Sequence, residues 1–173
     1  AEDGIRDKLV TGVQTCALPI CVVAIRPQAP SAEAERFMDW LLAGLADGSL
    51  HFNDQSAMVH FVPEGMLLVS PRIFRVFARR WGEEPWRRSK GASGGDAEVG
   101  KAIQLQVLRA GWHVLAGPGV NILTYQVMSG DAPVSRLSGV VIRQPERFVT
   151  SVPPANPRLV RLDRKSTRLN SSH

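Results

Sequence analysis

The stretch "VHFVPEGMLLVSPRIFRVFARRWG" (residues 59–82) decides the fold, because its apolar pattern changes from that of strands to that of a helix. Two β-rich runs, 59–62 and 66–69, are separated by Pro-Glu-Gly, which is typical of a short hairpin or a bent strand pair. Ser70 and Pro71 then predict a helix start, with Ser70 as the N-cap and Pro71 in the first helical position. The stretch therefore predicts paired strands that lead directly into a helix.

This helix is expected to be amphipathic. Its apolar residues recur at helical spacing on one face: Ile73, Phe74, Phe77 and Trp81. Its basic residues lie three and four positions apart on another face: Arg72, Arg75 and Arg79. The first face predicts a core contact, and the second presents guanidinium groups to solvent or to an anionic partner.

The flanking segments predict two further helices. Upstream, "PSAEAERFMDWLLAGLADGSL" (residues 30–50) has Ser31 as a candidate N-cap and Gly48 as the stop signal. Downstream, residues 82–95 form a loop by composition, because they are rich in glycine and serine. Asp96 is then expected to cap a third helix that ends at Gly111.

Strand signals follow the third helix. "WHVLAGPGVNILTYQV" (residues 112–127) reads as two strands around a turn at residues 117–119, and "SRLSGVVI" (135–142) as one further strand. "SVPPANPRLVRL" (151–162) reads as an extended, proline-rich exit. The order of helix, short β segment, two helices and β-hairpin predicts an α+β, winged-helix-like fold, in which a three-helix cluster carries a β-hairpin wing.

Both ends of the chain resemble translated sequencing adapters. "DRKSTRLNSSH" (residues 163–173) and "AEDGIRDKLVTGVQTCALPI" (1–20) can each be written back into adapter codons, and Cys21 falls on the junction. We therefore expect residues 1–21 and 163–173 to be non-native and residues 22–162 to form one native domain. The alternative is a pair of genuine disordered tails.

Composition restricts the classes of function. The chain has 21 Lys and Arg against 16 Asp and Glu, a net charge of +5, which permits an anionic partner without requiring one. Both cysteines, Cys16 and Cys21, lie in the adapter-like N-terminal part, so the native part has no thiolate metal site. No apolar run has the length of a membrane span. A cytoplasmic protein without membrane insertion is expected.

The sequence offers no catalytic or cofactor motif. His51, His60 and His113 are scattered without metal-ligand spacing, so no metal site is predicted. "GASGGD" and "GPGVN" are glycine-rich but lack the Lys-Ser/Thr ending of a phosphate loop. No nucleophile–base pair stands out. We therefore expect no catalytic residues and no cofactor in this segment.

The candidate site is a basic DNA-binding surface. Its expected backbone contacts are the helical arginines and three residues of the following loop: Arg72, Arg75, Arg79, Arg87, Arg88 and Lys90. Its expected groove readers lie on the third helix: Lys101, Gln104 and Arg109. The alternative interpretation is a solvated helix face beside a polar loop. Leu105 and Leu108 stand among the groove readers and favour burial against another domain. The tryptophans at 40, 81, 86 and 112 are interpreted as packing residues.

Five segments together resemble a known family: "RFMDWLLAGLADGSLHFN", "VHFVPEGMLLVSPRIFR", "GVNILTYQV", "SRLSGVVI" and "PPANPRL". They are similar to the C-terminal domain of the TraI-type conjugal-transfer nickase/helicase, a relaxase of integrative conjugative elements. The resemblance runs from about residue 33 to residue 162. It implies a winged-helix-like fold and a role in processing element DNA for transfer. Catalytic residues of that family belong to its N-terminal part, so none is carried over.

Three hypotheses of function remain. The first is a non-catalytic C-terminal module that docks a DNA-nicking relaxase on DNA, through weak contacts, or on the conjugation machinery. The second is a protein interaction module without DNA contact, which uses the Leu105 and Leu108 surface to hold its own N-terminal relaxase domain. The third is an independent winged-helix transcription regulator.

Overall fold

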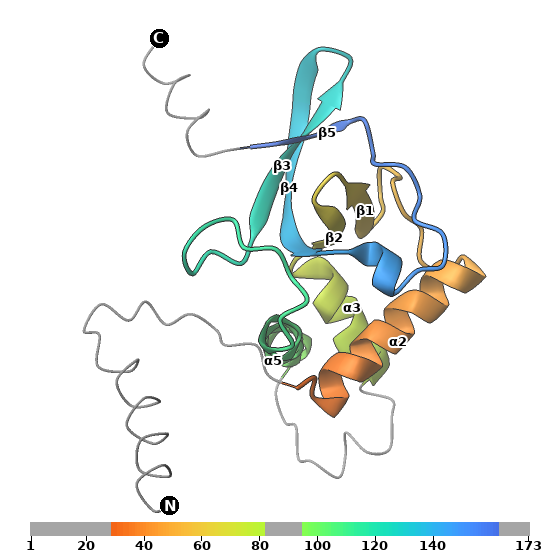
Figure 1. The fold of residues 1–173 in the computed structure, drawn as a ribbon, viewed down its shortest axis with the longest axis vertical. Helices are drawn as coiled ribbons and strands as arrows, with labels where there is room; N and C mark the ends of the chain where they lie inside the picture. The colour runs from red at the N-terminus through yellow and green to blue at the C-terminus, as the bar shows by residue number, and fades with distance from the viewer. Residues whose placement is uncertain (1–28, 82–94, 163–173) are drawn as a thin grey trace, which may run out of the picture.

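The computed structural model describes residues 29–81 and 95–162. In this part of the chain, three α-helices lie below one antiparallel sheet of five strands, which curls into a half-barrel (Figure 1). The elements are, in chain order, α2 (Ala32–Asp47), β1 (Val59–Val62), β2 (Gly65–Val69), α3 (Arg72–Trp81), α5 (Asp96–Arg109), β3 (Leu123–Ser129), β4 (Ala132–Ile142), the 3-10 helix η1 (Pro145–Arg147) and β5 (Leu159–Arg161).

The winged-helix prediction is wrong. The sheet order is β1-β2-β4-β3-β5, so the early hairpin and the late hairpin form one continuous sheet. The joint is the pairing of β2 with β4, in which Met66 lies opposite Ile142 and Val69 opposite Gly139. A wing would be a two-stranded addition to a helical cluster. Here the sheet is a layer of its own, because strands far apart in sequence share their backbone hydrogen bonds.

One of the two predicted hairpins is found in the structure where it was expected, and the other is not. The first is confirmed, because β1 and β2 pair across a turn at residues 63–64. The second lies elsewhere than predicted: β3 and β4 meet at Gly130-Asp131, where Gly130 has a φ of 64°. A two-residue hairpin turn requires this left-handed conformation, which glycine adopts without strain. A turn does form at the predicted residues 117–119, closed by an isolated bridge between Gly117 and Val120, but no strand lies between α5 and β3 in the described part of the chain.

The helix ends follow local chemistry in part. Ser31 caps α2 as predicted, with its hydroxyl oxygen accepting from the Ala34 N–H at 3.2 Å, and Gly48 ends the helix at a φ of 80°. α3 begins at Arg72, one residue later than predicted, and the Ser70 hydroxyl donates to the side chain of Gln104 instead of capping α3. α5 begins at Asp96 itself and ends at Arg109, two residues before Gly111.

The main core lies between the helices and one face of the sheet. Its centre is a set of aromatic rings from α2 and α3: the Phe37 ring stacks on Phe74 with centroids 4.9 Å apart and meets Phe77 edge-on at 5.3 Å. α5 closes this core with its apolar stripe, which includes Ile103 and Val107. The apolar residues predicted for one face of α3 are all buried: Ile73, Phe74, Phe77 and Trp81. The predicted apolar face of α3 is therefore confirmed.

A smaller core covers the opposite face of the sheet. It contains Leu67, Leu123, Tyr125 and Val141 and is closed by β5. The Tyr125 hydroxyl donates to Glu64 at 2.8 Å, and burial together with this carboxylate raises the pKa of the phenol above its usual range. Both faces of the sheet therefore carry a hydrophobic core: the helices cover one face, and the smaller core covers the other.

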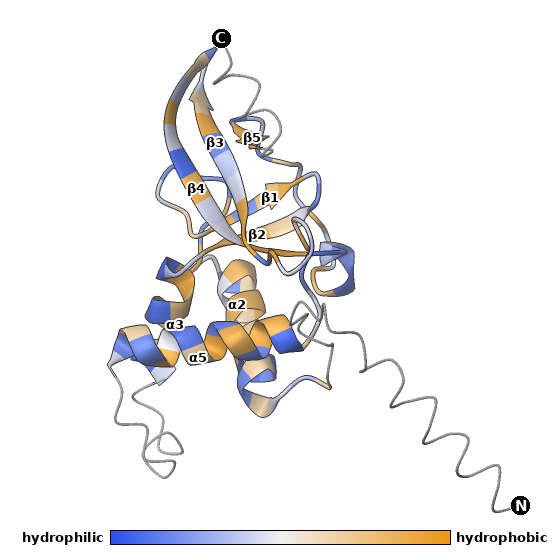
Figure 2. Cartoon of the chain, turned by 90° about the vertical axis from the view of Figure 1, so that its left-hand side faces the viewer, coloured by the Kyte–Doolittle hydropathy of each residue, from blue (hydrophilic) through white to orange (hydrophobic). Residues whose placement is uncertain are grey.

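The far end of the β3–β4 hairpin extends beyond both cores. Residues 132–136 of β4 are exposed, and Figure 2 shows this end projecting away from the helices. The edge strand β1 is protected instead. Asn53 accepts a hydrogen bond from the Phe61 N–H at 2.7 Å, and the Asn156 N–H donates to the Phe61 carbonyl oxygen at 2.7 Å. Asn53 of the loop before β1 and Asn156 of the proline-rich exit thus occupy the backbone groups of Phe61, which hinders the pairing of β1 with a foreign strand.

Several expectations concern other parts of the chain. The segments expected to be adapter-derived, residues 1–21 and 163–173, lie outside the described residues. The same holds for residues 82–94 of the glycine-rich loop. Within 29–81 and 95–162, none of the helices combines the length and the apolar character needed to cross a bilayer.

Candidate nucleic-acid interface

Helices α3 and α5 run antiparallel, side by side, and carry the candidate surface. Three contacts fix their register. Arg79, near the end of α3, meets Asp96 at the start of α5. Gly100 approaches the backbone of Phe74 and Arg75 so closely that an added Cβ would lie 3.2 Å from the Arg75 nitrogen. Gln104 then accepts the hydrogen bond of Ser70 at the start of α3.

The predicted arginine face exists. Arg72, Arg75 and Arg79 are exposed, while the apolar residues of α3 are buried. The three side chains line an open hollow of about 420 Å³, together with Pro71 and Val76. α3 therefore turns its aromatic side into the core and its guanidinium groups into one shared hollow.

The three arginines are not equivalent. The Nε of Arg79 donates to Asp96 at 3.0 Å, and the two side chains remain 76% and 44% exposed. An exposed pair of this kind contributes little to stability, but it neutralises one charge of the face. Among the described residues, no carboxylate pairs with Arg72 or Arg75. These two guanidinium groups are the positive centre of the surface.

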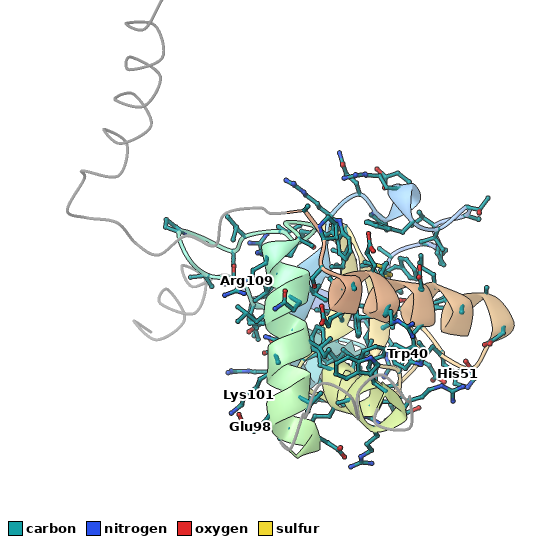
Figure 3. The ribbon with its side chains drawn as sticks, turned by 90° about the horizontal axis from the view of Figure 1, so that it is seen from below. Trp40, His51, Glu98, Lys101 and Arg109 are labelled. Atoms are coloured by element: carbon teal, nitrogen blue, oxygen red, sulfur yellow. The ribbon has the colours of Figure 1, made fainter. Side chains whose placement is uncertain are left out.

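The predicted groove readers separate. Lys101 and Arg109 are exposed and project from α5 on the side away from α2, with Lys101 in the first half of the helix and Arg109 at its C-terminal end (Figure 3). Lys101 is paired with Glu98 at 3.1 Å. Gln104 is half-buried and already serves as the partner of Ser70, so it links two elements of the domain. The structure therefore does not bring Lys101, Gln104 and Arg109 together as one reading edge.

The remaining residues of the predicted surfaces are either outside the described part of the chain or differ from one another in burial. Arg87, Arg88 and Lys90 lie outside the described residues. Leu108 is buried in the main core of the domain, and Leu105 is 38% exposed. The two leucines therefore do not form a shared surface for another domain, because only one of them is accessible.

The histidines have structural surroundings. His60 is 2% exposed, with Nε2 3.2 Å from the Ala57 carbonyl oxygen and Nδ1 3.2 Å from the Asn156 amide. Burial lowers the pKa of His60 and of His113, so both favour the neutral ring. His51 is exposed on the loop after α2. No group of three or more His, Cys, Asp or Glu side chains within the described part of the chain could hold a metal ion.

The sequence did not assign a second hollow, on the other side of α3. It measures about 300 Å³ and lies between α2 and α3, where Figure 3 places Trp40. Its lining residues are Arg36, Asp39, Trp40, Phe77, Arg80 and Trp81. Part of this site could be found in the sequence, because Arg36 and Trp40 are one helical turn apart and so share a face of α2. The periodicity of α2 alone does not show that Arg80 of α3 lines the same hollow.

Comparison with known proteins identifies two similarities. The sequence model of the family described as "Putative conjugal transfer nickase/helicase TraI C-term" matches residues 32–162. The crystal structure of the C-terminal domain of Salmonella enterica protein STY4665, a DUF1528 domain, superposes with a TM-score of 0.56 at 17% identity, covering 78% of this chain and 100% of that one. At this identity the likeness concerns the fold alone. No curated protein matches the sequence.

Proposed function

Because the chain belongs to the family of TraI conjugal transfer C-terminal domains, we propose that it is a non-catalytic module that docks a conjugal-transfer relaxase on DNA. The proposed contact surface is the arginine face of α3, formed by Arg72, Arg75 and Arg79. The family match supports the conjugal-transfer setting, and the arginine face supports the contact with DNA.

The observation that carries this proposal is the pair of exposed guanidinium groups on Arg72 and Arg75. They line one open hollow, and among the described residues no carboxylate pairs with either of them. Arginine offers a planar fork of donors that fits phosphate oxygens, so two or three of these groups in a row suit a nucleic-acid backbone. Backbone contacts of this kind position a protein without reading sequence.

The expected mode of binding is weak and dependent on salt. Each phosphate neutralised by a cation releases condensed counterions, which gives a slope of about −0.9 in a plot of log affinity against log salt concentration. A few such contacts correspond to the non-specific range, with a dissociation constant of about 1–100 μM at physiological salt. The module would therefore add local affinity to a larger enzyme rather than select a site.

Gln104 has a changed role in this proposal. Its side chain accepts a hydrogen bond from Ser70, so reading a base edge would require it to leave an internal partner. Lys101 and Arg109 remain exposed and are proposed as peripheral backbone contacts beside the arginine face. The same is proposed for Arg87, Arg88 and Lys90, which lie outside the described residues.

A second candidate function is docking on a protein of the transfer machinery. It is favoured by the loop that leads into β3, where Leu115 is 56% exposed and Val120 39% exposed. Exposed apolar side chains that lie close together often mark a protein interface. This candidate replaces the Leu105 and Leu108 surface, because Leu108 is part of the domain's own core.

The two candidates are separated by one titration. The full chain is added to labelled duplex DNA at low salt, and the anisotropy is compared with that of a triple variant, Arg72→Gln, Arg75→Gln and Arg79→Gln. DNA docking predicts clear binding by the wild type and a loss of affinity in the triple variant for every DNA sequence. A double variant, Leu115→Ser and Val120→Ser, is the matched control and should bind DNA as the wild type does. Equal binding by the wild type and the triple variant would contradict the proposal.

A further inference from the structure

The hollow between α2 and α3 is built from aromatic rings at its floor and charged groups at its rim. It has a volume of about 300 Å³ and lies where Figure 3 labels Trp40. This volume is at the lower end of the range of about 300–1,000 Å³ found for small-molecule sites. The hollow can therefore accept one small group.

The floor is a preorganised stacking platform. The Trp40 ring contacts Phe37 at 5.8 Å and Phe77 at 5.3 Å between centroids, and Trp81 stacks on Phe77 at 6.1 Å with an interplanar angle of 23°. The two phenylalanines are buried, which fixes the orientation of the indole, while Trp40 itself is only half-buried. The Trp40 side chain is thus partly accessible and is held against two buried rings, an arrangement that suits the stacking of a base.

The rim is basic and continues into the arginine face. Arg36 of α2 and Arg80 of α3 line the hollow. Arg80 follows Arg79 directly, so the two side chains leave α3 about 100° apart around the same turn. The arginine hollow runs along α3 as far as Arg79, and the aromatic hollow lies at the last turn of the same helix, so one extended chain of phosphates could contact both.

We propose that this hollow holds one unpaired nucleotide of single-stranded DNA, with its base stacked on Trp40 and its phosphates held by Arg80 and Arg36. The inference rests on the proposed function, because the strand must first be held along α3. A duplex keeps its bases inside the stack, so only a single strand can present a base to this platform. A proline-rich peptide could also lie on aromatic rings, but it would give the guanidinium groups no role.

Asp39 gives the hollow a preference among bases. Among the described residues, no hydrogen-bond donor or cation pairs with its carboxylate, which lines the hollow beside the two arginines. A carboxylate accepts a hydrogen bond from an exocyclic amino group, such as N4 of cytosine, whereas thymine presents the acceptor O4 at the same position. The hollow should therefore prefer a base with an amino group, and cytosine is the smallest of these.

The test uses the full chain and three labelled probes: oligo(dC), oligo(dT) and a duplex of the same length. Affinities are measured by fluorescence anisotropy for the wild type and for Trp40→Leu, which keeps an apolar side chain but removes the π face. Loss of one base stack weakens binding by roughly tenfold or more. We expect this loss for oligo(dC) and no more than a twofold change for the duplex. Trp112→Leu is the matched control, since Trp112 is also half-buried but packs on Phe148 in another part of the domain.

A second variant keeps the inference testable if Trp40→Leu does not fold. Asp39 is exposed, so Asp39→Ala leaves the core unchanged. We expect the wild type to bind oligo(dC) more tightly than oligo(dT), and Asp39→Ala to bind the two equally. Equal affinities in the wild type would refute the base preference.

The outcomes also separate this inference from the proposed function. If Trp40→Leu folds and binds single strands as the wild type does, the stacking site is wrong, while a loss in the triple arginine variant still supports DNA docking. If Trp40→Leu folds and loses duplex binding to the same extent, the hollow does not select single strands, and the inference is again wrong. If the wild type binds none of the probes, the proposed function itself fails.

Discussion

The pair between Arg79 and Asp96 predicts how strongly salt weakens DNA binding. In the wild type, Asp96 neutralises Arg79, and Arg72 and Arg75 have no carboxylate partner among the described residues. At about −0.9 per phosphate contact, the two unpaired arginines give a slope of about −1.8 in log affinity against log salt. Replacing Asp96 by Asn releases the third arginine and should steepen the slope to about −2.7.

These slopes correspond to a measurable difference in affinity. Between 50 and 200 mM salt, the contacts of the arginine face alone should weaken binding about 12-fold in the wild type and about 40-fold in Asp96→Asn. The difference of about 0.9 between the two slopes is the decisive quantity. Contacts proposed for Lys101, for Arg109 and for residues outside the described part of the chain add equally to both proteins and cancel in this difference.

The assay is the anisotropy of a labelled duplex over a series of salt concentrations, with the full chain and each variant. Asp131→Asn is the matched control, because Asp131 is an exposed carboxylate at the turn of the β3–β4 hairpin, far along the chain from α3. It changes the net charge by the same amount and should leave the slope unchanged. Two results would refute the reasoning: equal slopes for the wild type and Asp96→Asn, or an equal steepening in Asp131→Asn. Thermal unfolding should confirm that Asp96→Asn remains folded, since removing an acidic residue from a first helical turn costs only about 0.3–1 kcal/mol.

Three further predictions concern stability and catalysis. Gly139→Ala should reduce the free energy of unfolding in urea by about 3 kcal/mol or more, because its Cβ would overlap the Leu68 carbonyl oxygen on β2; a change below about 1 kcal/mol would show that the sheet can adapt. Burial lowers the pKa of His60, so the unfolded chain binds more protons at acid pH, and the free energy of unfolding should fall as the pH drops below about 6.5; the same slope in His60→Gln would show that this histidine is not responsible. The full chain should neither nick supercoiled DNA with Mg²⁺ nor hydrolyse ATP, because its sequence carries no nucleophile–base pair and no phosphate loop; nicking that copurifies with the protein and is lost in a variant would contradict this.

The sequence alone determined the features that depend on neighbouring residues. Ser31 and Gly48 fix the ends of α2, because a cap needs only the backbone of its own turn. The hairpin of β1 and β2 closes over two residues, so both strands and their turn lie within one short stretch. The periodicity of α3 separates its arginines from its aromatic residues, because 3.6 residues per turn fix the side from which each side chain leaves the helix. The family, too, was suggested by motifs along the chain and is now established by the match over residues 32–162.

Only the tertiary structure decided which elements the helix faces and the strands contact. The pairing of β2 with β4 joins residues far apart in the chain, and each strand pattern shows which side chains point inward without naming the neighbouring strand. The winged-helix prediction failed at this point. The partners of Gln104 and Arg79 depend on how the three helices pack, and so does the hollow that Arg80 and Trp40 line together. The periodicity of one helix does not contain this information. Local spacing orients a side chain relative to its own helix, whereas a site needs the positions of several elements at once, and those are set by the packing of the whole core.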